Sequence, residues 1–539
     1  MNQPDYVVVG GGSSGCVVAH RLTLAGKKVL LLEDGPPDNS QFIHMPATFI
    51  KVIGSKRTVV YESDPQPAAN GRVSYVPQGR TLGGGSSVNA MIYIRGQRQD
   101  YDDWEQQGCT GWGWDQVLPA FRKAEGHMRL GGELHGTDGP LRVSDTRFRH
   151  PLSLAFVKAA QECGLKYNDD FNGEDQSGVG FYHTTTFNGQ RGSTASTYLA
   201  AAKKMPNLEV QTGCYVHKLL FDDNKRVTGV VYRNGEGKIV TVSVNEEVIL
   251  CAGALATPKI LMLSGIGPAE ELSKHGIQPL AVREQLGQNF QDHLEVSVYG
   301  RTRKPISLLG NDQGLKALKH GIEWKLFRHG LLTSNVVESG CFVDTNGEGR
   351  PDIQFHVLPT LVGDVDREPL AGHGISLNPC FLRPKSRGSV RLRSANPDDP
   401  MQFDSGALSE QADVDALVRG VRLARKILRS PALAEVIEQE LKPSPEAEIS
   451  DAEIEAHVRS HAKTVYHPVG TCRMGSDPEA VVSPTLAVNG VSGVRIADAS
   501  IMPTLVSGNT NAPVVMIAER CAEFVLEEAK AKTNSGVAA

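Results

Sequence analysis

The chain has 539 residues, enough for two or three domains of ordinary size and for a large buried core. Its 56 basic and 61 acidic side chains give a net charge of −5, so nothing in the charge suggests a nucleic-acid partner. The nine cysteines form no C-x-x-C pair and are few for so long a chain. The sequence therefore predicts neither a disulfide framework nor a zinc site, and a reducing compartment fits best.

The sequence predicts neither a signal peptide nor a transmembrane segment. The first apolar strand begins at Tyr6, which leaves no room for a leader. The most apolar long stretch, residues 248–267, is interrupted by Thr257, Pro258 and Lys259. We therefore expect a cytoplasmic protein, with peripheral association with a membrane left open.

The beginning of the chain has the pattern of a dinucleotide-binding unit. A β-branched run at 6–9 is followed by the glycine turn 10–15, a helical pattern at 16–25 and a second strand that ends on Glu33. The turn has the form G-x-G-x-x-G, and Glu33 follows Gly12 by 21 residues, close to the roughly 20 typical of a ribose-binding acid. The alternative is a glycine turn in an ordinary α/β unit, and the motif alone does not separate FAD from NAD. The predicted nucleotide contacts are Gly10, Gly12, Ser13, Ser14, Gly15 and Glu33.

Three longer segments resemble the signatures of the glucose–methanol–choline (GMC) oxidoreductases. They are residues 79–89, 253–267 and 466–475, the last followed by 498–503 and 507–513. Their order is that of the family, and the resemblance runs from the first strand to the last helix. It implies an α/β fold (α+β overall) with a Rossmann-like FAD-binding domain and a substrate domain built on an antiparallel sheet with flanking helices.

The nucleotide-binding segments are far apart in the sequence, so the substrate domain must be built from insertions. We predict an FAD-binding domain from 1–150, 191–300 and 464–539, and a substrate-binding domain from 151–190 and 301–463. Alternating runs at 353–357 and 389–392 predict strands of an antiparallel sheet with one face covered, and 413–428 has helical spacing. The active site should lie between this sheet and the flavin.

The resemblance also implies further cofactor contacts. In the first signature these are Leu82, Gly83, Ser87, Asn89 and Met91, and elsewhere in the chain they are Val216, Asp498, Ala499 and Thr510. Val88 stands where some family members attach FAD through a histidine, so we expect non-covalent FAD. Thr257 has the pattern of a helix N-cap, and Pro258 has that of the first helical position.

Oxidation of an alcohol removes a hydroxyl proton and a carbon-bound hydride, so a base of near-neutral pKa is needed. The resemblance assigns that role to His467, followed by the rigid Pro468, and a polar partner role to Asn511, whose amide would hold the alcohol oxygen. Asn511 could instead cap the helix that starts at Ala512 and Pro513. Tyr466 and Arg367 are weaker candidates for substrate contacts, and a solvated arginine is the commoner role for Arg367.

The function implied by the resemblance is oxidation of a primary alcohol to the aldehyde, with hydride transfer to flavin N5 and electrons passed to a quinone or another acceptor. Residues 333–340, 382–388 and 394–397 resemble members that use an acceptor other than oxygen. A family oxidase that makes hydrogen peroxide is the main alternative, and a non-redox lyase or a mere nucleotide-binding protein is a further one. Which alcohol, which acceptor and which oligomeric state stay open.

Overall fold

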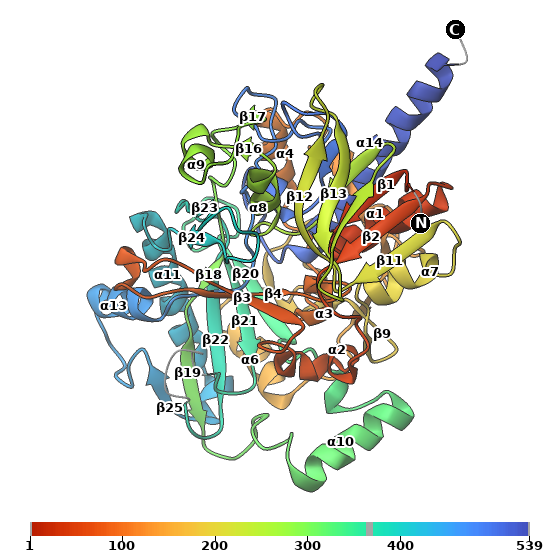
Figure 1. Ribbon diagram of the computed structural model, residues 1–539. Helices are drawn as coiled ribbons and strands as arrows, with labels where there is room; N and C mark the ends of the chain where they lie inside the picture. Colours follow the sequence, from red (N-terminus) through yellow and green to blue (C-terminus); the bar gives the residue numbers. More distant parts are fainter. Residues whose placement is uncertain (1–2, 363–369, 537–539) are drawn as a thin grey trace.

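The computed structural model describes residues 3–362 and 370–536, and two sheets organise them (Figure 1). A parallel sheet lies near the N-terminus, and a larger antiparallel sheet lies beside it, closer to the centre of the view. Each sheet has its own hydrophobic core. Any site formed between the sheets can therefore draw on both halves of the chain.

The parallel sheet has the order β11-β2-β1-β15-β27. Its strands are β1 (Tyr6–Val9), β2 (Val29–Glu33), β11 (Leu208–Thr212), β15 (Glu247–Leu250) and β27 (Val494–Ile496). Helices α1 (Ser13–Leu24) and α14 (Asn511–Gly536) pack against each other. The two strands and the helix predicted at the N-terminus are confirmed. Every residue of β1, β2 and β15 is buried, as expected of parallel strands covered on both faces.

The antiparallel sheet has the order β25-β19-β22-β21-β20-β7, with β18 paired to β22 and β26 paired to β18. These strands are β7 (Gly178–Phe181), β18 (Leu294–Glu295), β19 (Val298–Thr302), β20 (Ser339–Val343), β21 (Ile353–Leu358), β22 (Gly374–Phe381), β25 (Ile437–Lys442) and β26 (Lys463–Thr464). Helices α6 (Pro151–Glu162) and α11 (Gln411–Leu428) pack on one face. Ile353, Phe355 and Val357 enter that core, so alternation along β21 turns the intervening side chains to the other face.

Two sequence expectations about this region are wrong. All eight residues of β22 are buried, so the centre of the sheet is covered on both faces and not on one, while the edge strand β25 keeps exposed residues. The run predicted as a strand at 389–392 is β23 (Ser389–Arg391), which pairs with β24 (Gln402–Asp404) in a separate two-stranded sheet. The predicted division into two domains stays a prediction, and β19 crosses its boundary at residue 300.

The remaining elements that bear on the site lie around these sheets. They are α2 (Gln41–His44), β3 (Thr58–Glu62), β4 (Tyr75–Gly79), α3 (Gly85–Val88), β12 (Tyr215–Phe221), β13 (Val227–Arg233), β14 (Ile239–Ser243), α8 (Thr257–Leu263) and α10 (Gly314–Phe327). Ala256, not Thr257, is the N-cap of α8, and the Thr257 hydroxyl bonds elsewhere. Among the described helices we find none whose length and apolar character would carry it across a bilayer. The nine cysteines, all in described positions, are unpaired.

Close packing of α1 on β1 depends on Gly15. A Cβ at this position would lie 1.9 Å from the carbonyl oxygen of Gly10, so Gly15→Ala must push the helix away from the strand. We expect Gly15→Ala to lower the free energy of unfolding by about 1–3 kcal/mol, as overpacking does, and to reduce the amount of flavin retained. Denaturant titration and the flavin absorbance of the purified protein measure the two effects.

Gly321→Ala in α10 is the matched control. A Cβ on Gly321 would meet no heavy atom within 4 Å. Since alanine is preferred over glycine inside a helix, this variant should be as stable as the wild type or more stable by up to about 1 kcal/mol. Equal stability of the two variants would contradict the packing argument.

Candidate functional site

A cavity of about 1260 Å³ runs from the glycine turn after β1 to the loop that carries His467. It is lined by many of the residues predicted from the sequence: Gly10, Gly12, Ser13, Ser14, Glu33, Asn89, Met91, Val216, Tyr466, His467, Asp498, Ala499, Thr510 and Asn511. Four more of the predicted residues, Gly15, Leu82, Gly83 and Ser87, do not line the cavity and lie close in the sequence to residues that do. Arg367 lies outside the described residues.

At one end, two glycine turns pack on each other at the start of α1. The backbone N–H of Gly83 donates to the carbonyl of Gly11 at 2.7 Å. A Cβ on Gly84 would lie 2.7 Å from the Cα of Gly12, so only glycine fits there. No side chain caps the N-terminus of α1, and its first-turn N–H groups face the cavity, which suits a pyrophosphate.

Glu33 lies at the end of β2, where a ribose-binding carboxylate is expected. Its two oxygens accept the backbone N–H groups of Gly11 and Gly35, each at 2.8 Å. Burial raises the pKa of the Glu33 carboxyl. Each carboxylate oxygen keeps a second acceptor position, so the group is fixed in direction and can still accept ribose hydroxyls.

Asp498 ties three segments of the cavity wall together. One oxygen accepts the backbone N–H of Gly253 at 2.8 Å and the Thr257 hydroxyl at 2.6 Å, and the other accepts the N–H and hydroxyl of Ser500 at 2.9 and 2.6 Å. Burial raises the pKa of the Asp498 carboxyl. The side chain therefore holds the exit of β15, the start of α8 and the turn 499–501 in place.

At the other end of the cavity, His467 belongs to a chain of two neutral imidazoles. His293 Nε2 lies 2.9 Å from the carbonyl oxygen of Leu382, which can only accept, so this nitrogen carries the proton. His293 Nδ1 is then an acceptor, and it lies 3.0 Å from His467 Nδ1, which must donate. His467 Nε2 is thereby left as an acceptor, and the residue lines the cavity.

Burial accounts for the neutral state of both rings. It lowers the pKa of His293 to about 4. Burial, with smaller effects of His293 and His356, holds the pKa of His467 well below the usual histidine range. At neutral pH His467 is therefore unprotonated on Nε2, which is the state a general base requires.

The amide beside His467 belongs to Asn509. Its Nδ2 lies 3.5 Å from His467 Nε2, and its Oδ1 accepts from Gln354 Nε2 at 3.1 Å, which fixes the orientation of the amide. Asn511 instead donates from Nδ2 to the Ser13 hydroxyl at 2.9 Å. The structure thus corrects the sequence prediction, because Asn509 and not Asn511 is the polar partner of His467.

Asn511 starts α14 and joins this helix to the glycine turn. Its Oδ1 is buried without a hydrogen-bond partner among the residues that the structure describes, and the residue lines the cavity. A buried acceptor of this kind is costly unless a bound molecule supplies a donor. The orphaned oxygen, the glycine cradle and the uncapped helix together fit a dinucleotide in this part of the cavity.

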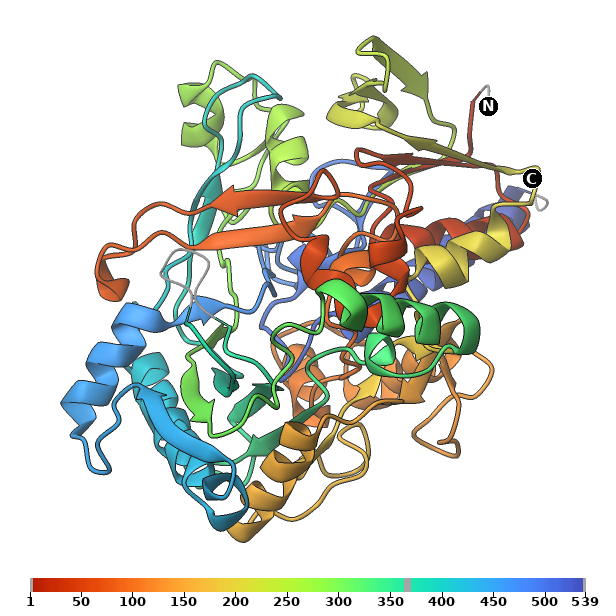
Figure 2. The ribbon, with the colours of Figure 1, turned by 90° about the horizontal axis from the view of Figure 1, so that it is seen from below.

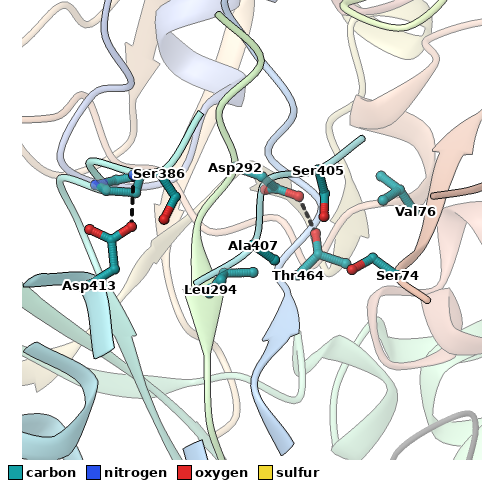
Figure 3. A pocket seen from close by; sticks show the side chains of 10 residues that line it. Ser74, Val76, Asp292, Leu294, Ser386, Ser405, Ala407, Asp413 and Thr464 are labelled. Atoms are coloured by element: carbon teal, nitrogen blue, oxygen red, sulfur yellow. Dashed lines mark hydrogen bonds between the residues drawn. The ribbon is translucent and has the colours of Figure 1, made fainter. Parts of the chain in front are cut away.

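The backbone of His467 is held by Asp292. The His467 N–H donates to Asp292 Oδ1 at 2.8 Å, and the Thr464 hydroxyl bonds to the other oxygen (Figure 3). A small space of about 20 Å³, lined by Asp292 and Thr464 among others, lies behind this contact. Tyr466, which lies between Thr464 and His467 in the sequence, has a φ of +69°, a strained backbone value for a residue with a side chain of this size. Asp292 and Thr464 thus hold a turn that points His467 into the cavity.

Polar side chains from β18, β21 and β22 complete this end. Glu295 Oε2 lies 2.9 Å from His356 Nδ1, and Lys463 Nζ lies 3.9 Å from the other Glu295 oxygen. Glu295, His356, Lys463 and Asn378 all line the cavity. The antiparallel sheet therefore offers a substrate both apolar surface and a paired carboxylate.

Sequence reasoning did not identify Asp292, His293, Gln354 or Asn509. The signal for the first two was present, because an acid and a histidine stand in consecutive positions in a mostly buried stretch between Leu286 and Val298. Buried polar residues in such a stretch need partners. For Asn509 the sequence held no signal that separates it from Asn511 two residues later.

The partly buried Asp292 makes a testable pH prediction. Burial raises the pKa of its carboxyl to about 7, against about 3.9 in an unfolded chain. A raised pKa contributes stability that is fully present below about pH 4 and is lost as the pH rises through about 7. Asp292→Asn, which mimics the protonated acid, has no such dependence.

The free energy of unfolding of the wild type should therefore fall, relative to Asp292→Asn, by on the order of 4 kcal/mol between pH 4 and pH 8. Urea titrations of both proteins across this range measure the difference. A difference that is constant with pH would show that Asp292 is ionised in the folded protein.

Comparison with known proteins agrees with this geometry. Family models described as GMC oxidoreductase match residues 4–295 and 384–518. The alcohol dehydrogenase [acceptor] of Pseudomonas putida is 45% identical over 534 residues, 97% of this chain and 96% of that protein. The mitochondrial choline dehydrogenase of Homo sapiens is 42% identical over 534 residues, 97% of this chain and 89% of that one.

Solved structures share the whole fold. Pyridoxine 4-oxidase from Mesorbium loti superposes with a TM-score of 0.88 at 30% identity and covers 97% of this chain and 99% of its own. A formate oxidase reaches a TM-score of 0.92 at 26% identity, over 98% of this chain and 99% of its own. With both ends of the sequence matched by the family models and full-length relatives above 40% identity, the chain belongs to the GMC oxidoreductase family.

Proposed function

We propose that this chain oxidises a primary alcohol to the aldehyde with non-covalently bound FAD and passes the electrons to a quinone or another acceptor. The observation that carries the proposal is the acceptor lone pair of His467 Nε2 beside the Asn509 N–H, at the end of a cavity whose other end suits a dinucleotide. The similarity to an alcohol dehydrogenase [acceptor] and to choline dehydrogenases supports an alcohol as substrate.

In the proposed reaction, His467 and Asn509 bind the alcohol oxygen and remove its proton. An alcohol oxygen between His467 and Asn509 would donate its proton to His467 Nε2 while accepting the Asn509 N–H. The imidazolium formed in this way keeps its Nδ1–H bond to His293, which stabilises the charge. Bound FAD supplies the acceptor for the hydride that leaves the carbon.

Several residues of this chain would hold FAD. The start of α1 and the Gly83–Gly84 turn suit the pyrophosphate, Glu33 the ribose, and the unpaired Asn511 Oδ1 a donor near the glycine turn. Val88 lines the cavity where a linking histidine would stand, so acid precipitation should release the flavin into the supernatant. Flavin that remains on the washed pellet would contradict non-covalent binding.

The second candidate is an oxidase that returns the electrons to oxygen. Its support is the likeness to solved structures titled pyridoxine 4-oxidase and formate oxidase. Both candidates use the same base and the same hydride acceptor. Turnover of one alcohol with oxygen alone, and then with a quinone or a dye under nitrogen, separates them.

A cationic alcohol such as choline is the alternative to a neutral one. The Glu295 carboxylate in the cavity wall could attract a positive charge, but it already pairs with His356 and approaches Lys463. This pairing favours a neutral primary alcohol. Comparison of kcat/KM for choline and for a neutral alcohol of similar size tests the choice.

His467→Ala tests the base. We expect the variant to retain FAD, because the nucleotide end of the cavity is built by other segments, and to reduce its flavin about 10²–10⁴ times more slowly, the usual effect of removing a general base. Anaerobic stopped-flow reduction by an alcohol measures the rate. Flavin reduction at the wild-type rate would mean that another group takes the proton.

Asn509→Ala and Asn511→Ala form a matched pair. Loss of the Asn509 N–H should slow flavin reduction by about 10²-fold, with FAD still bound, because the donor to the alcohol oxygen is gone. Asn511→Ala removes the bond between Ser13 and α14 and should weaken FAD retention instead. Flavin reduction rate and flavin content are measured for both variants, and the opposite pattern would restore the role that the sequence assigned to Asn511.

A further inference from the structure

Helix α10 presents an apolar face to solvent. Its residues Leu315, Leu318, Ile322 and Leu326 follow one another at intervals of three and four, which places them on one side of a helix. Their exposed fractions are 84%, 59%, 48% and 67%. In an ordinary surface helix this stripe would face the core, but in α10 it faces solvent. Seen from below, α10 is the green helix that lies at the front of the molecule (Figure 2).

The orientation is fixed by the other side of the helix. Trp324 is buried and donates its indole N–H to the carbonyl of Gly189 at 2.7 Å. The Arg328 guanidinium stacks on the same ring at 3.9 Å from its centroid. The apolar stripe therefore points outward because the helix is anchored through the opposite side, and not because the helix is loosely placed.

The charges around the stripe are mostly positive. Residues 314–327 contain three lysines, Lys316, Lys319 and Lys325, all exposed, and a single acid, Glu323. The chain as a whole carries a net charge of −5, so this helix opposes the overall balance. An apolar stripe with a basic rim is the pattern of helices that lie in the interface of an anionic membrane.

The helix also lies beside an opening of the cavity. Ile50 lines the cavity and is 59% exposed, and the neighbouring Lys51 pairs with Asp312, two residues before α10, at 3.5 Å. In Figure 1, α10 lies at the edge of the molecule, away from the bulk of both sheets. A flat apolar surface that covered α10 would face this opening.

We propose that α10 is a membrane-docking helix that inserts its apolar stripe into the surface of an anionic lipid bilayer. The leucines and Ile322 enter the boundary between headgroups and acyl chains, and the lysines contact lipid phosphates. The inference does not depend on the proposed function, because lipid binding is measured without turnover. If that function also holds, docking would place the cavity opening next to apolar alcohols or quinones dissolved in the bilayer.

A second copy of the chain fits this face less well. Two such helices packed through their stripes would bring lysines against lysines, which is unfavourable. A helix of 14 residues is about 21 Å long, so one face of it covers much less than the roughly 800 Å² per partner of a stable interface. Lipid supplies both the apolar partner and the opposite charge.

The test uses the full FAD-loaded protein in flotation with vesicles. We expect the wild type to float with vesicles of phosphatidylcholine mixed with phosphatidylglycerol, and to bind pure phosphatidylcholine vesicles at least about tenfold more weakly. Leu318→Glu with Ile322→Glu should lower the partition coefficient about 100-fold, since each buried apolar side chain is worth about tenfold. Lys316→Gln with Lys325→Gln should remove most of the preference for the anionic lipid.

The control is Leu154→Glu with Ile239→Glu, which makes the same change at exposed positions of α6 and β14. It should bind vesicles like the wild type, and all variants should keep their flavin and their rate with a soluble alcohol. Absence of wild-type binding to the anionic vesicles, or equal binding by the α10 double variant, would overturn the proposal. So would a wild-type dimer in sedimentation that Leu318→Glu with Ile322→Glu dissociates, because a second copy would then cover the face.

Discussion

The chemistry proposed for this protein depends on one hydrogen bond between two neutral histidines. The carbonyl of Leu382 decides which nitrogen of His293 carries a proton, and His293 in turn decides the tautomer of His467. A protonated His293 would have no acceptor to offer, and His467 would then have to turn its lone pair inward. Burial prevents this by lowering the pKa of His293 to about 4. A backbone carbonyl of the antiparallel sheet region thus determines that the base presents a lone pair to the cavity.

The two halves of the fold divide the work of building the cavity. The parallel sheet and the glycine turns provide a rigid backbone surface with unpaired N–H groups, where no side chain is needed. The antiparallel sheet provides side chains, and Gln354 on β21 orients the Asn509 amide while Ile353 and Phe355 on either side of it enter the core. Alternation along one strand therefore serves stability on one face and the site on the other.

Buried carboxylates connect these halves without entering the chemistry. Asp292 holds the backbone of His467, and Asp498 holds three segments around the cofactor end. Both have a raised pKa because burial disfavours the charge, although each accepts several hydrogen bonds. Helix α10 differs from these buried groups, since it exposes four apolar side chains along one stripe.

The sequence by itself determined the elements whose signal is local. The strand, glycine turn and helix at the N-terminus are specified by residues that contact each other within one βαβ unit, and the predicted bounds of β1 match the structure. The role proposed for His467 came from the resemblance of residues 466–475 to a family signature. The helix at 413–428 followed from its apolar spacing alone.

Tertiary structure decided what depends on a distant partner. Asn509 and Asn511 have the same side chain two residues apart, and only the positions of Gln354 and Ser13, more than a hundred residues away, show which amide reaches His467. Likewise β23 pairs with β24, the next strand in the chain, and the two form a sheet separate from the large one. Periodicity records which face of an element is apolar, but a hydrogen bond between distant segments leaves no local pattern, so only the folded chain shows which amide lies beside His467.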